Sequence, residues 1–166
     1  WKPVKLIARH SLEGSVIDSS SSHRGNLVVV LTDSNINIFI NRELVETIQL
    51  TGGKKVVVAD DASRIIVLSS DSLTCYTRWG EVKWKITEIN EESIFVNKNT
   101  ENKIIFSVGN NLKTVNRFGE IENTISLDSD IISLSESNSN IAVLTHNSIN
   151  IINENSELTR VKVTDY

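Results

Sequence analysis

The side chains best suited to chemistry in this sequence are three histidines and two acidic segments. His10, His23 and His146 stand far apart, and none has a cysteine or a second histidine at the spacing of a zinc site. The carboxylates of residues 60–61 and 128–130 could ligate a hard cation, but neither segment has the ligand density of a dedicated calcium loop. No Gly-x-Ser-x-Gly elbow or glycine-rich phosphate loop occurs. We therefore predict no catalytic residues, no metal and no cofactor.

A recurring pair of arginine and aromatic residues is the strongest candidate for recognition. Residues 78–80 are Arg-Trp-Gly, residues 117–119 are Arg-Phe-Gly, and residues 41–42 are Asn-Arg at the corresponding place. Arginine and aromatic side chains anchor protein interfaces, because they bury a large area at modest entropic cost. Alternatively, these residues have only structural roles. The glycine then occupies a turn position with positive φ, the aromatic residue caps the edge of the sheet, and the arginine pairs with the glutamate that follows. The candidate protein-binding rim consists of Arg42, Arg78, Trp79, Arg117 and Phe118.

These turns recur because the chain repeats itself about four times, with a period of roughly 37 to 40 residues. In each repeat, an aliphatic run precedes a turn rich in Asp, Asn and Ser, and a second run follows the turn. Short runs bounded by turn formers predict β-strands joined as a tight hairpin. The runs before the turn are residues 27–31, 65–68, 104–106 and 141–144, and those after it are residues 36–40, 73–76, 112–115 and 149–152.

Two further strands complete each repeat. An alternating, half-exposed strand such as residues 82–86 follows the next turn, and a short first strand, such as residues 15–17, precedes the polar loop at residues 18–24. Four-stranded antiparallel units at this period are typical of propeller blades. We predict an all-β fold: a β-propeller or partial propeller of about four four-stranded antiparallel blades in a single region, residues 1–166. The predicted blades are residues 14–50, 51–88, 89–127 and 128–166, and residues 1–13 hold an orphan strand from a preceding blade.

Residues 64–86 resemble the repeat of quinoprotein-type, or PQQ-like, propellers. They contain an aliphatic strand, an Asp-containing turn, a Leu-x-x-Tyr strand and then Trp79-Gly80 followed by Trp84. In such families the second tryptophan docks between adjacent blades, which the resemblance implies for Trp84. WD40-like repeats are the close alternative, but no Trp-Asp pair closes a third strand here.

The resemblance does not bring the quinone cofactor with it. Quinone-dependent dehydrogenases of this type are far longer chains, and they commonly have a vicinal disulfide and calcium ligands. Cys75 is the only cysteine in this chain. We interpret the likeness as shared architecture rather than shared chemistry.

The number of repeats leaves three arrangements open. Propellers with blades of this size close with up to about eight blades. The chain is then a piece of a larger propeller, a half ring completed by a second copy or another subunit, or a small closed ring of four blades. An open arc would expose apolar faces at its ends, which a partner normally covers.

Composition bounds the partners and the compartment. With 39% hydrophobic residues and a net charge of -4, the chain has no basic footprint for nucleic acid, and no apolar run approaches the ~20 residues of a membrane helix. A single cysteine favours a reducing compartment, so we expect a cytoplasmic or nuclear protein. We expect a non-enzymatic scaffold of a larger protein or complex, which binds other protein subunits or self-associates through open blade edges. The alternatives are part of an enzyme or ligand-binding propeller whose site lies partly outside this chain, and a half ring completing another subunit's propeller.

Overall fold

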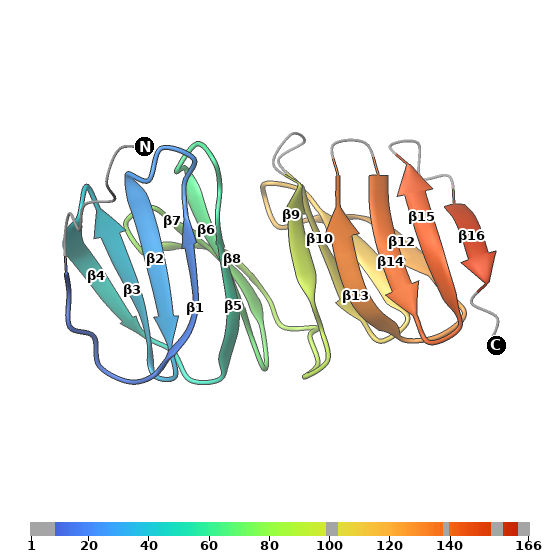
Figure 1. Ribbon diagram of the computed structural model, residues 1–166, viewed down its shortest axis with the longest axis horizontal. Helices are drawn as coiled ribbons and strands as arrows, with labels where there is room; N and C mark the ends of the chain where they lie inside the picture. Colours follow the sequence, from blue (N-terminus) through green and yellow to red (C-terminus); the bar gives the residue numbers. More distant parts are fainter. Residues whose placement is uncertain (1–8, 99–102, 138–139, 154–157, 163–166) are drawn as a thin grey trace, which may run out of the picture. The chain divides into compact units, whose positions relative to one another are not determined.

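Short aliphatic runs between turn formers become β-strands in all four repeats, from β1 to β16 (Figure 1). The computed structural model describes residues 9–98, 103–137, 140–153 and 158–162. Within these residues, sixteen strands form four sheets, and each sheet contains four strands in sequence order. Across these described segments, no helix is long and apolar enough to span a membrane. The predicted all-β fold, with four-stranded antiparallel blades, is confirmed.

We number the four sheets as blades one to four. Blade one consists of β1 (Val16–Ser21), β2 (Leu27–Thr32), β3 (Asn35–Ile40) and β4 (Glu43–Gln49). Blade two consists of β5 (Gly53–Val58), β6 (Arg64–Ser69), β7 (Leu73–Thr77) and β8 (Val82–Ile86). Blade three consists of β9 (Phe95–Lys98), β10 (Lys103–Val108), β11 (Asn111–Val115) and β12 (Ile121–Ser126). Blade four consists of β13 (Ile131–Glu136), β14 (Asn140–Thr145), β15 (Ser148–Asn153) and β16 (Leu158–Lys162).

The first strand of blade one is longer than the sequence predicts. Its polar residues 18–21 were expected in a loop, but they pair with β2 and continue β1 to Ser21. The predicted orphan strand lies partly outside the described residues, and residues 9–12 form no strand. The blade boundaries and the single propeller region over residues 1–166 stay predictions.

The chain divides into two compact units, one with residues 1–69 and 76–81 and the other with residues 70–75 and 82–166. In the first unit, alternate residues of β2 and β3 form a fully or almost fully buried face, which we call the front face of blade one. It packs against residues of β5 and β6, so the aliphatic side chains of these strands are buried between the two blades. The front face contains Leu27, Val29, Leu31, Ile36, Ile38 and Ile40, and its partners include Val56, Val58, Ile65 and Val67.

Side chains of β1 also bind the edge of β5. The Asp18 carboxylate accepts a hydrogen bond from the Val56 N–H, and the Ser20 hydroxyl accepts one from the Val58 N–H, each at 2.9 Å. An edge strand carries N–H groups that no strand of its own sheet can pair. The polar residues of β1 therefore satisfy the donors of the neighbouring blade, and this role explains their place in a strand.

The second unit has its own core between blades three and four. Ile105 and Leu112 of blade three pack with Ile141, Val143 and Ile152 of blade four. In β14 and β15, buried and exposed residues alternate along each strand. Blade four thus buries one face against blade three and leaves its other face exposed.

We predict that Asp18→Ala will lower the free energy of unfolding by about 1 to 3 kcal/mol, because the Val56 N–H loses its acceptor in a partly buried position. Urea denaturation monitored by tryptophan fluorescence will measure the loss. Asp18→Asn keeps a carbonyl oxygen at the same place and should retain most of the stability. Equal losses in both variants would show that the negative charge, rather than the acceptor, stabilises this contact.

Candidate interaction site

The turn between β7 and β8 is a three-residue hairpin loop that presents Trp79. The Thr77 N–H donates to the Glu81 carbonyl oxygen (2.7 Å), and the Gly80 N–H donates to the Thr77 carbonyl oxygen (3.1 Å). Gly80 has φ +90°, a value that glycine adopts without the steric cost of a side chain. The Thr77 hydroxyl accepts further hydrogen bonds from the N–H groups of Trp79 and Glu81, both at 3.2 Å. Four hydrogen bonds and a glycine at positive φ thus hold this loop.

The turn between β11 and β12 is built in the same way around Asn116. Its side-chain oxygen accepts from the N–H groups of Phe118 (2.9 Å) and Glu120 (3.1 Å), and Gly119 has φ +89°. The Asn116 amide also donates to the Glu120 carboxylate at 2.8 Å. Sequence reasoning missed the roles of Thr77 and Asn116. The available signal was a side-chain acceptor placed directly before both Arg-aromatic-Gly-Glu segments.

Each turn stacks its arginine on its own aromatic ring. The guanidinium carbon of Arg78 lies 5.3 Å from the centre of the Trp79 ring, and that of Arg117 lies 4.6 Å from the centre of the Phe118 ring. Both distances fall within the range of cation–π attraction. The rings remain open to solvent, with 57% of Trp79 and 65% of Phe118 exposed. Each turn therefore presents a cation and a large apolar ring as one rigid pair.

Trp84 lies against the second turn. Its indole N–H donates to the Arg117 carbonyl oxygen at 3.2 Å, and a Cβ added to Gly119 would lie only 2.6 Å from the indole ring. The side chain is half-buried. The indole ring therefore lies against Gly119, whereas the Phe118 ring is largely exposed. Docking of Trp84 as a structural role stays a prediction.

Arg42 occupies a different kind of turn. Asn41 and Arg42 form a two-residue connection between β3 and β4, with φ of 51° and 79°. Two positive φ values are typical of the type I′ hairpin turn. Arg42 is exposed and has no aromatic residue beside it in sequence. A common rim that includes Arg42 stays a prediction.

The other candidate residues take part in local contacts. The His10 ring packs against Phe39 in a tilted arrangement, with 4.8 Å between ring centres and 53° between the ring planes. The Asp61 carboxylate bonds the N–H of Ser63 at 3.0 Å, and the hydrogen bond from the Ser63 side chain holds the pKa of Asp61 below its usual value. Asp128 pairs with Arg160 at 3.3 Å. Among the described residues, no group of three His, Cys, Asp or Glu side chains could hold a metal ion.

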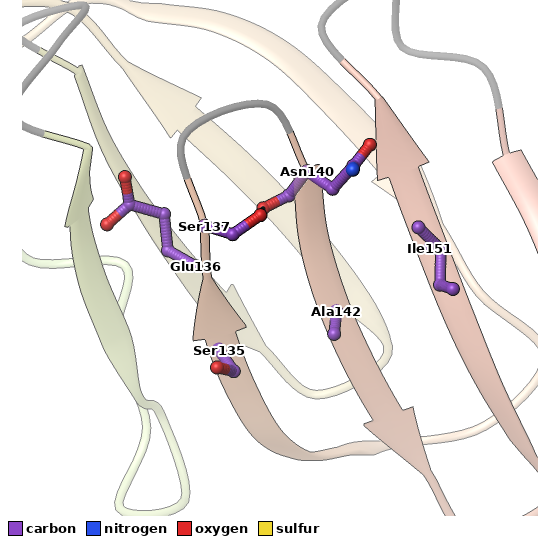
Figure 2. A pocket seen from close by; sticks show the side chains of 6 residues that line it. All are labelled: Ser135, Glu136, Ser137, Asn140, Ala142 and Ile151. Atoms are coloured by element: carbon purple, nitrogen blue, oxygen red, sulfur yellow. Dashed lines mark hydrogen bonds between the residues drawn. The ribbon is translucent and has the colours of Figure 1, made fainter.

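A shallow depression of about 190 Å³ lies on the exposed face of blade four (Figure 2). Small-molecule pockets usually have volumes of about 300 to 1,000 Å³. This depression is therefore small for a ligand site. It is lined by Ser135, Glu136, Ser137, Asn140, Ala142 and Ile151.

Comparison with known proteins identifies the architecture. No family model and no curated protein matches this chain. Among chains of known structure, BamB from Moraxella catarrhalis matches 94% of this chain and 52% of its own, with a TM-score of 0.74 and 8% identity. The chain has the fold of a β-propeller or of part of one. KlHsv2 with loop 6CD replaced by a Gly-Ser linker matches 87% of this chain and 50% of its own, with a TM-score of 0.62 and 11% identity.

These matches confirm the resemblance to PQQ-like propellers at the level of fold. In total, 759 chains of known structure resemble this one, and such a widely used fold hosts many functions. The chain spans about half the length of each of these two proteins. Identities of 8% and 11% carry the likeness no further than the fold.

The cytoplasmic or nuclear location expected from the sequence is wrong. BamB is a periplasmic lipoprotein associated with the bacterial outer membrane, so the matching architecture belongs to another compartment. The error came from the cysteine count. A chain whose blades stack large aliphatic faces requires no disulfide in an oxidising compartment either, so one cysteine does not report the location.

We predict that Gly119→Ala will destabilise the protein more than Gly25→Ala does, by at least about 1 kcal/mol. Both glycines have positive φ, which strains alanine by about 1 to 2 kcal/mol. Only at Gly119 does the added methyl group also collide with Trp84, whereas nothing lies within 4 Å of it at Gly25. Urea denaturation of the two variants gives the difference. Equal losses would show that the indole moves away freely and does not support the turn.

Proposed function

We propose that this chain is a non-enzymatic protein-interaction platform, which binds partner proteins through the two Arg–aromatic turns. The observation that carries the proposal is that two separate turns of identical hydrogen-bond design each present an exposed aromatic ring under an arginine. Large exposed rings cost solvation free energy in a protein without a partner. Trp, Tyr and Arg are also the residues most often found as hot spots of protein interfaces.

The construction of the turns supports binding rather than folding as the role of the rings. Side-chain acceptors, a glycine at positive φ and paired backbone groups fix each loop before any partner arrives. Preorganised loops lose little conformational entropy on binding. The two rings contribute little to the core of either unit, because more than half of each ring is exposed.

The chemistry of the turns suggests what a partner must offer. The ring requires an apolar pocket, and the guanidinium requires a carboxylate or carbonyl oxygen at the rim of that pocket. We therefore expect partner proteins with an acidic, apolar surface at the contact.

We predict that Trp79→Ala and Phe118→Ala will each weaken partner binding by at least about tenfold, as expected for hot-spot residues. The full chain serves as bait in extract of the organism that carries the gene, and captured proteins are quantified by mass spectrometry. Calorimetry with the purified partner then gives the affinities. Because both rings are largely exposed, the thermal stability of both variants should equal that of the wild type.

Leu44→Ala is the matched control, since Leu44 is 49% exposed and belongs to β4 rather than to either Arg–aromatic turn. This variant should bind as the wild type does. If the two ring variants capture the same proteins with the same affinity as Leu44→Ala does, the turns are structural and the proposal fails.

A further inference from the structure

The last strand of blade two, β8, has a different chemical character on each of its two faces. Successive side chains of a strand point to opposite faces of the sheet. Lys83 and Lys85 therefore share one face of β8, and Val82, Trp84 and Ile86 share the other. One face is cationic, whereas the other is apolar.

β8 also forms an edge of its sheet, because it ends the strand order β5-β6-β7-β8. In the part of the chain that the structure describes, no further strand pairs with its outer side. The outward N–H and C=O groups of such an edge can pair with an extended segment. The side chains along the edge are accessible, since Val82 is 61% exposed and both lysines are exposed as well.

The two lysines of β8 carry positive charge that the protein does not neutralise locally. Among the described residues, neither Lys83 nor Lys85 has an ion-pair or hydrogen-bond partner. The two charges are two residues apart on one face, in a chain whose net charge is -4. Complementary charge favours a partner and suppresses wrong ones, so this edge selects an acidic segment.

The outer strands of the other blades differ from β8 in their charges. β4 contains two glutamates and no cation. In β12, Glu122 pairs with Lys103 at 3.6 Å, and in β16, Arg160 pairs with Asp128 at 3.3 Å. β8 is thus set apart by a row of like charges that lacks counter-charges within the described residues.

The lysines also disfavour pairing of β8 with a second copy of itself. Like charges directly opposite each other on neighbouring strands are destabilising, whereas opposite charges stabilise the pair. Lysines on edge strands commonly prevent edge-to-edge association for this reason. A strand that carries carboxylates does not meet this barrier, so the same two residues discriminate between partners by charge.

We propose that β8 binds an extended acidic segment of a partner protein, which adds a fifth strand to blade two. The added strand places its acidic residues beside Lys83 and Lys85, and its apolar residues beside Val82 and Ile86. The preferred segment therefore alternates Asp or Glu with Val, Ile or Tyr. Backbone hydrogen bonds supply the affinity of such a contact, and the alternating side chains supply its specificity.

This contact uses the edge of β8 and neither Arg–aromatic turn. Its failure and that of the proposed function are therefore separate results. Variants of Trp79 and Phe118 should leave the binding of an acidic strand unchanged, and variants of Lys83 and Lys85 test only the edge of β8.

The test is fluorescence anisotropy of the full chain with a labelled peptide of about ten residues that alternates Glu and Val. We expect saturable binding in the micromolar range, and none for a peptide that alternates Lys and Val. Lys85→Glu should raise the dissociation constant at least about tenfold, because a favourable cross-strand pair becomes a repulsive one. Arg24→Glu is the matched control, with the same change of charge at an exposed loop residue of blade one. No saturable binding to the wild type, or equal dissociation constants for both variants, would overturn the proposal.

A second measurement separates strand pairing from attraction between charges alone. In an added strand, the N–H groups of alternate residues point toward the neighbouring strand, and those between them point away. Two peptides are therefore compared, one N-methylated at every Glu and the other at every Val. One should bind at least about tenfold more weakly, because its methyl groups face β8, and the other should bind as the parent peptide does. Equal affinities of the two methylated peptides would contradict strand addition.

Discussion

A four-stranded sheet of this size cannot bury its aliphatic side chains alone, and the structure depends on that constraint. Its strands are short, so a single sheet gains too little apolar burial to offset the conformational entropy of some 40 ordered residues, at about 1.5 kcal/mol each. Stacking provides the missing burial. All six residues of β3 and of β6 are buried, which requires cover on both faces of these strands. The repetition of the sequence follows, because each repeat must offer one face to the repeat before it and one to the repeat after it.

Polar side chains complete what aliphatic stacking begins. A stacked blade brings the edge of its first strand close to its neighbour, where unpaired N–H groups would be costly. Asp18 and Ser20 remove that cost in the first unit. Polar side chains also satisfy free N–H groups in the turns. The side chains of Thr77 and Asn116 accept hydrogen bonds from N–H groups that a sharp hairpin leaves unpaired. The loops are consequently rigid enough to hold an arginine over an exposed ring.

The predictable parts of this structure are those set by local pattern. Aliphatic runs between turn formers predicted the inner strands, and the recurring Arg-aromatic-Gly segments predicted two turns of one kind. The length of β1 was not predictable in this way, because residues 18–21 are polar and their acceptor role depends on a strand 38 residues away. The contact of Trp84 with Gly119 is equally remote in sequence, and only the family resemblance suggested a docking role for this tryptophan. The prediction of the compartment was wrong for a different reason, since cysteine content reports on disulfides rather than on location.

The way in which blades meet also limits how they can associate. Two exposed strand edges pair readily with each other, and such pairing can continue without end, as in amyloid. In blade one the incoming N–H groups instead meet side-chain oxygens on the face of a sheet. This face-to-edge contact requires acceptors at alternate positions of one strand and aliphatic residues at matching positions of the next two. Few surfaces satisfy both conditions, so stacking between blades is selective although most of its surface is plain hydrocarbon.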